Sequence, residues 1–177
     1  MSLTKDPLLS VAKVVLALCI VLFIFLMAMM LIGIGALLTV GRPEVMAELA
    51  DADSPASVYW AVIGVLVLVE VLLAAILKFL LELRGIVKSV ERGDPFEPAN
   101  ADRLSRMGWL TVGGYAVAVV LGAAVAWIKS AAGEAGKDIN VDFGLDGGGI
   151  LLILVLFILA RVFRQGAAMR ADLEGTV

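Results

Sequence analysis

Two charged side chains, Glu70 and Arg161, stand in otherwise apolar segments, where their type and spacing could support chemistry. A carboxylate near the middle of a bilayer costs at least ~2.5–3.5 kcal/mol, so Glu70 is expected to face other helices rather than lipid. Counted from the same side of the membrane, Glu70 is about the twelfth residue of its segment and Arg161 about the thirteenth of its own. At about 1.5 Å per residue these depths are similar. The spacing predicts a buried ion pair between Glu70 and Arg161.

Such a pair has two interpretations. In the first, Glu70 relays a proton or cation, or its protonation shifts the packing of the helices. In the second, Glu70 is a structural residue that stays paired or protonated. A transport pathway normally needs more than one polar group inside the membrane, which favours the structural interpretation.

The other residue types argue against catalysis. Histidine is absent, which removes the commonest acid–base catalyst and the commonest metal ligand. No G-x-S-x-G, H-E-x-x-H or P-loop pattern occurs. Cys19 is the single cysteine, and Met27, Met29 and Met30 are better explained as apolar filler than as a copper(I) site. We expect no enzyme activity, no catalytic residue, no metal and no cofactor.

A ladder of small residues marks one apolar segment at intervals of four: Gly114, Ala118, Gly122 and Ala126. Residues spaced in this way share one helix face and let another backbone approach closely. The face is expected to pack within the chain's own bundle, and the alternative is a seam between copies in a homo-oligomer.

The elements that must position these residues are membrane helices. The chain has 177 residues, of which 62% are hydrophobic and 18% charged, with a mean hydropathy of +1.03. About 20 apolar residues suffice to cross a bilayer. The hydropathy predicts an all-α, integral membrane four-helix bundle forming one domain over residues 1–177. Its spans are expected at about 11–40, 57–81, 107–128 and 149–167, with an inner loop at 82–106 and outer loops at 41–56 and 129–148.

The basic residues predict the orientation of the bundle. Arg42, Lys129 and Lys137 fall in the outer loops, and the other eleven of the 14 Lys and Arg residues fall on the opposite side. The positive-inside rule therefore places both termini and the inner loop of this multi-pass membrane protein in the cytoplasm. The net charge of −3 gives no reason to expect direct binding to nucleic acid.

The inner loop carries helix signals at both of its ends. Residues 83–90 are expected to continue the second helix past the membrane. Asn100 is a plausible N-cap for a helix that leads into the third span.

Two stretches resemble a known family when taken together. They are RGDPFEPANADRLSRMGWL at residues 92–110 and LLILVLFILARVFRQGAAMRADLEGTV at residues 151–177. Both are similar to the bacterial membrane-protein family catalogued as domain of unknown function 2975. The matching loop positions are Gly93, Pro95, Phe96, Asn100, Arg103 and Leu104. The matching closing positions are 156–160, Val162, Phe163 and Gly166. This resemblance covers the inner loop and the third and fourth spans.

The resemblance implies a four-helix bacterial inner-membrane protein without an assigned activity. Genes of the family often lie beside a small helix-turn-helix regulator of the Cro/C1 type, which implies an interaction or regulatory module acting on a cytoplasmic partner. The tail is shorter here, and Gly175 departs from the family's ending. The alternatives are a small transporter or channel subunit that uses Glu70, and a purely structural protein. The loop residues could equally form only a rigid turn before the third span.

Overall fold

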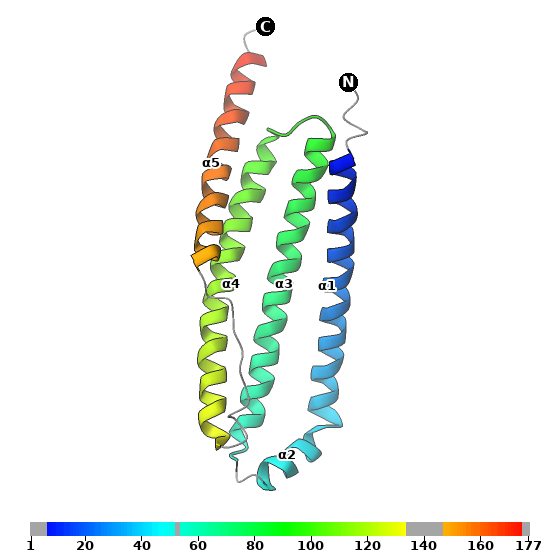
Figure 1. Ribbon diagram of the computed structural model, residues 1–177, viewed down its shortest axis with the longest axis vertical. Helices are drawn as coiled ribbons and strands as arrows, with labels where there is room; N and C mark the ends of the chain where they lie inside the picture. The colour runs from blue at the N-terminus through cyan, green and yellow to red at the C-terminus, as the bar shows by residue number, and fades with distance from the viewer. Residues whose placement is uncertain (1–6, 52–53, 134–146, 175–177) are drawn as a thin grey trace. The chain divides into compact units, whose positions relative to one another are not determined.

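The computed structural model describes residues 7–51, 54–133 and 147–174, and all five elements in these ranges are helices (Figure 1). They are α1 (Pro7–Thr39), α2 (Arg42–Asp51), α3 (Ser57–Glu91), α4 (Pro98–Ala131) and α5 (Gly147–Glu174). The helices α1, α3, α4 and α5 are long and apolar enough to cross a membrane. The prediction of an all-α protein with four transmembrane helices is confirmed.

The end of α3 agrees with the prediction, whereas the start of α4 differs from it. Helix α3 continues to Glu91, as expected for residues 83–90. Helix α4 begins at Pro98, so the prediction of Asn100 as an N-cap is wrong: Asn100 lies inside the first turn. Proline suits the first position of a helix because its fixed φ is already helical and its missing N–H would have had no partner there. Most of the second predicted outer loop, residues 134–146, lies outside the described residues.

Within the predicted outer loop at 41–56, residues 42–51 form the short helix α2. Pro43 lies in its first turn, and Glu44 adds a negative charge close to the positive end of the helix dipole. These signals lie outside any apolar run, which is why hydropathy passes over them.

The chain divides into two compact units, each of which is described by itself. The first unit comprises residues 1–23, 75–113 and 146–177. Its core is a cluster of four buried side chains from α4 and α5, Leu104, Met107, Leu156 and Ala160. Four partly buried side chains pack against this cluster: Phe79, Leu83, Ile86 and Phe163. The first unit therefore joins α3, α4 and α5 through one apolar core.

The second unit comprises residues 24–74 and 114–145. Tyr59 is its best-buried aromatic residue, and its hydroxyl donates a hydrogen bond of 2.9 Å to the carbonyl oxygen of Leu37 in α1. The Tyr59 ring meets Trp60 edge-on, and the Arg42 guanidinium lies 5.6 Å from the centre of the Trp60 ring. Tyr59 and Trp60 thus link the start of α3 to α1 and α2.

Candidate functional site

The site is built on the turn between α3 and α4, whose first part is a glycine-dependent helix cap. Gly93 has a φ of 81°, in the left-handed region that suits glycine. The Gly93 N–H donates to the Val90 carbonyl (3.0 Å), and the Asp94 N–H donates to the Ser89 carbonyl (3.0 Å). This pair of bonds is a Schellman motif, which satisfies carbonyls that the end of a helix otherwise leaves unpaired. The cap ends α3 and reverses the chain toward α4.

A buried polar network then holds the turn against both helices. Asn100 and Ser89 are both 0% exposed. The Asn100 amide donates to Ser89 Oγ (2.5 Å) and to the Pro95 carbonyl (2.9 Å), while its oxygen accepts a bond of 2.7 Å from Arg103. Ser89 Oγ donates onward to the Ile86 carbonyl (2.7 Å). Buried polar groups that are fully satisfied in this way fix one geometry, so the turn is rigid.

The turn also packs against α5 through Phe96. Its ring centre lies 5.4 Å from that of Phe163, and its Cδ1 would lie 2.6 Å from a Cβ added at Gly166. A glycine at position 166 is therefore needed for the ring to approach this closely. The loop stretch and the closing stretch that were identified separately in the sequence are in direct contact here.

Ion pairs surround the turn on several sides. Arg106 makes two bonds of 3.0 Å to the two carboxylate oxygens of Glu82, a bidentate geometry that is among the strongest polar contacts. Among the described residues, five further pairs border the turn: Lys13–Glu91, Arg92–Glu97, Arg103–Glu97, Arg164–Asp102 and Arg170–Asp94. Through Lys13 and Arg170 the first turns of α1 and the last turns of α5 are both tied to the α3–α4 turn.

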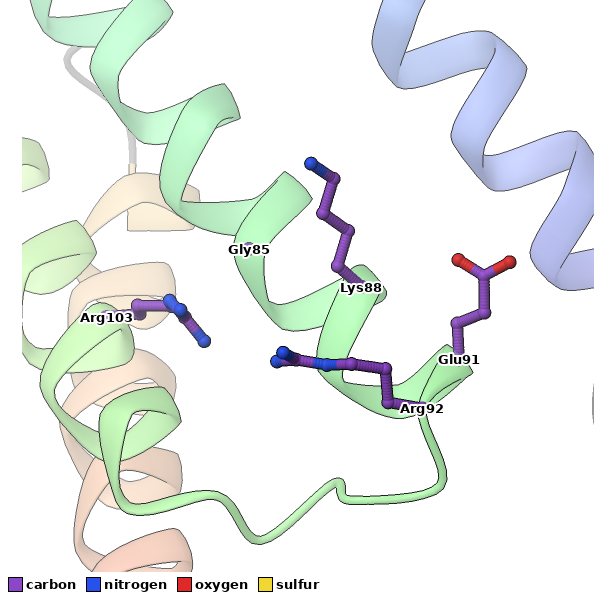
Figure 2. Close-up of a pocket in the computed structure, with 5 residues that line it drawn as sticks. All are labelled: Gly85, Lys88, Glu91, Arg92 and Arg103. Carbon is purple, nitrogen blue, oxygen red and sulfur yellow. The ribbon is translucent and has the colours of Figure 1, made fainter.

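One face of this turn opens into a cleft of about 380 Å³, shown in Figure 2. Its lining residues are Gly85, Lys88, Glu91, Arg92 and Arg103. Arg103 extends from α4 toward α3, and Arg92 extends into the same space from the end of α3 (Figure 2). A Cβ added at Gly85 would lie 2.7 Å from Arg103 Nε, so the absence of a side chain there gives Arg103 its place.

The chemistry of the cleft is that of an anion site. Three cations and one carboxylate line it. Arginine guanidinium groups bind carboxylate and phosphate groups in a planar, bidentate manner. Among the described residues, no group of three Cys, Asp or Glu side chains is placed to hold a metal ion. The cleft can therefore bind an anionic group by charge and hydrogen bonding.

The loop motif predicted from the sequence separates into structural residues and one cleft residue. Gly93, Pro95, Phe96, Asn100 and Leu104 form or pack the turn, with Leu104 in the core of the unit. Arg103 alone among the six reaches the cleft.

Sequence reasoning missed the other residues of the cleft. The available signal is Gly85 between Arg84 and Lys88, since a glycine inside a charged helix end often marks a close approach by a neighbour.

The predicted Glu70–Arg161 pair stays a prediction. Glu70 lies in the second unit, and Arg161 lies exposed on α5 in the first. Both carboxylate oxygens of Glu70 are buried and have no hydrogen-bond partner among the described residues.

The small-residue ladder belongs to the second unit, whereas the cleft residues belong to the first. A Cβ at Gly114 would contact Leu72 of α3 at 3.7 Å, Ala118 is buried, and Ala126 is exposed. Part of this face therefore turns inward within the unit. Packing within the chain's own bundle stays the prediction for this face, and a seam between copies stays the alternative.

Comparison with known proteins adds one match. A family model described as "Protein of unknown function (DUF2975)" matches residues 44–177. The match takes in α3 as well as the segments that carry the quoted motifs, so the likeness extends further along the chain than those motifs do. No curated protein and no solved structure matches the chain.

Proposed function

The chain belongs to the DUF2975 family of proteins of unknown function, and we propose that it is a membrane-embedded interaction module that binds an acidic segment of a cytoplasmic protein. In this proposal both termini and the α3–α4 turn face the cytoplasm, and the membrane is the inner (plasma) membrane. The excess of Lys and Arg on that side of the sequence supports this orientation.

The observation that carries the proposal is the cleft beside the α3–α4 turn. Lys88, Arg92 and Arg103 surround a space in which Glu91 is the single carboxylate. Glu91 is already paired with Lys13, and Glu97 is shared between Arg92 and Arg103, so the three cations of the cleft still carry a positive excess. The buried Asn100–Ser89 network fixes the turn before a partner arrives, which reduces the entropy lost on binding. A rigid basic cleft suits a short acidic segment.

The partner we propose is a small helix-turn-helix regulator of the Cro/C1 type, which the membrane protein would hold away from DNA. This choice rests on the family resemblance, whereas the charge of the partner's docking segment rests on the cleft.

Charge reversal at Arg92 tests the proposal, with Arg164 as the matched control. Each is an exposed arginine of the first unit (63% and 66%), and each has one ion pair, to Glu97 and Asp102 respectively. We expect Arg92→Glu to weaken binding of the purified regulator at least ~10-fold, because it turns an attractive contact into a repulsive one. Arg164→Glu should leave the affinity within about twofold. Binding is measured in mild detergent by biolayer interferometry.

Two results would reject this function. One is the absence of any measurable affinity between the purified chain and a purified helix-turn-helix regulator of the Cro/C1 type. The other is an equal loss of affinity in the Arg92 and Arg164 variants, which would place docking outside the cleft.

A second candidate function rests on Glu70, whose carboxylate oxygens are buried without a partner among the described residues. A buried ionisable group inside a membrane segment marks candidate proton or cation pathways. In this alternative the chain is a small transporter or channel subunit that assembles across the Gly114–Ala126 face to enclose a path. Proteoliposome flux that Glu70→Gln abolishes and Glu44→Gln, on the exposed helix α2, leaves intact would support it. Equal flux in both variants would exclude it.

A further inference from the structure

A second hollow in the first unit lies between α1 and α3 and has a volume of about 450 Å³. Helix α1 contributes Lys13, Val14 and Ala17, together with Ser10. Positions 10, 13, 14 and 17 are three or four residues apart, so they share one face of α1. We call this hollow the α1–α3 groove. Its α3 side carries Arg84, Lys88 and Glu91, which are again three or four residues apart.

The charges of the groove are unbalanced. Lys13 and Glu91 neutralise each other through an ion pair. Arg84 and Lys88 form no ion pair within the part of the chain that the structure describes, and both are exposed. The groove therefore presents one guanidinium and one ammonium group whose charges no protein carboxylate compensates. A small anionic group, such as a phosphate, would compensate these two positive charges.

The remaining wall of the groove distinguishes a lipid from a free ion. Val14 and Ala17 are apolar and exposed, and α1 continues with exposed Leu18 and Val21 on its way into the membrane. A free phosphate ion gains nothing from such a wall. A phospholipid places its phosphate among the cations and its acyl chains along the apolar helix surface, so its shape and polarity match both ends of the groove.

We propose that the α1–α3 groove binds the headgroup of an anionic phospholipid, with Arg84 and Lys88 contacting its phosphate and with Val14 and Ala17 lining the path of an acyl chain. Lys13 closes the polar end, where its pairing with Glu91 holds it in position. The groove shares Lys88 and Glu91 with the cleft beside the α3–α4 turn, but lipid binding does not require a protein partner and is tested without one.

Native mass spectrometry of the purified full-length chain in a neutral detergent tests the proposal. Phosphatidylglycerol and phosphatidylcholine with the same acyl chains are added in turn, and bound lipid is counted. We expect a preference of about tenfold or more for phosphatidylglycerol. Each cation near an anionic headgroup contributes about fivefold, so the Arg84→Gln/Lys88→Gln double variant should bind it about 25-fold more weakly. Arg164→Gln, which removes a cation elsewhere in the same unit, should bind it as the wild type does.

A second variant separates the lipid from a free anion. Ala17→Phe fills the apolar end of the groove without changing any charge. It should weaken phosphatidylglycerol binding severalfold, and 10 mM inorganic phosphate should not displace the lipid from the wild type. Circular dichroism and gel filtration check that each variant is folded. If the double variant does not fold, the binding of phosphatidylglycerol to Ala17→Phe tests the proposal alone.

Three results would overturn the proposal. Displacement of the lipid by inorganic phosphate, with normal lipid binding in Ala17→Phe, would make the groove a site for free anions. Equal losses in Arg164→Gln and the double variant would make the attraction diffuse rather than local. Equal binding of the two lipids to the wild type would mean that the cations of the groove do not select the headgroup.

Discussion

At the scale of residues, three glycines of the first unit lie where a neighbouring side chain leaves almost no room. A Cβ would lie 2.7 Å from Arg103 Nε at Gly85, 3.0 Å from Phe157 Cζ at Gly108 and 2.6 Å from Phe96 Cδ1 at Gly166. Arg103 is a flexible side chain and can move. The aromatic rings at Gly108 and Gly166 are held by their own packing, so the same added methyl group is harder to accommodate there.

Gly166→Ala should therefore destabilise the protein. Overpacking costs ~1–3 kcal/mol and the better helix propensity of alanine regains ~1 kcal/mol, so we expect a net loss of up to about 2 kcal/mol in the free energy of unfolding. Gly113→Ala is the matched control, because it lies in a helix of the same unit with nothing within 4 Å of the added Cβ. Thermal unfolding in detergent measures both. A lower midpoint for Gly113→Ala as well would mean that contact with Phe96 is not the cause.

The Asn100–Ser89 hydrogen bond should show coupling in a double-mutant cycle. Asn100→Ala removes the partner of the buried Ser89 Oγ and of the partly buried Pro95 carbonyl, which costs about 1–3 kcal/mol. Once Ser89 is alanine, the same change leaves one fewer group without a partner. The loss of unfolding free energy in the double variant should therefore be smaller than the sum of the two single losses by about 0.5–1.5 kcal/mol. Denaturant unfolding measures all three losses. Strict additivity would contradict the network.

Asn100 also shows how much of a residue's role can be predicted from residue types alone. Its type and its place before an apolar span predict a helix cap, and its presence in the motif marks it as important. Its actual role depends on Ser89, eleven positions upstream in another helix. Nothing in the local pattern around Asn100 indicates that partner, because the contact exists only once α3 and α4 are packed together.

At the scale of elements, the sequence predicts the membrane helices well and their ends less well. The apolar runs place α1, α3, α4 and α5, because a bilayer demands about 20 apolar residues in a row. Hydropathy does not predict where a helix ends outside the membrane. The end of α3 is set instead by Gly93 and its cap, and the start of α4 by Pro98.

The cap of α3 can be tested at Gly93. Its φ of 81° is unfavourable for residues with a Cβ, so Gly93→Ala should lower the free energy of unfolding by about 1–2 kcal/mol. Asparagine tolerates this conformation better, so Gly93→Asn should lose clearly less. The unfolding midpoints of the two variants in detergent provide the comparison. Equal losses for alanine and asparagine would indicate that the backbone conformation at Gly93 does not limit stability.

At the scale of the whole molecule, the candidate site illustrates what composition can and cannot provide. The hydropathy and the distribution of Lys and Arg suffice to predict a four-helix membrane protein and a basic side. The cleft cannot be predicted from these features, because it brings Lys88 and Arg92 at the end of α3 together with Arg103 from α4 across a turn. Which of the basic residues gather around one space depends on the register in which α3 and α4 pack. Contacts of Asn100, Leu104 and Arg106 with α3 accompany that register, and none of them is visible in the local sequence pattern.

The orientation itself is the last prediction. After Cys19→Ser, single cysteines at Asp102, near the α3–α4 turn, and at Ala47, on α2, present exposed thiols in segments predicted on opposite sides. In intact cells a membrane-impermeant maleimide should label Ala47→Cys and spare Asp102→Cys, because the positive-inside rule predicts that the side rich in Lys and Arg faces the cytoplasm. Labelling of both after lysis serves as the control for thiol accessibility.

A reporter fused after Val177 should likewise be active only as a cytoplasmic fusion. Labelling of Asp102→Cys in intact cells would invert the topology and place the basic cleft out of reach of any cytoplasmic partner.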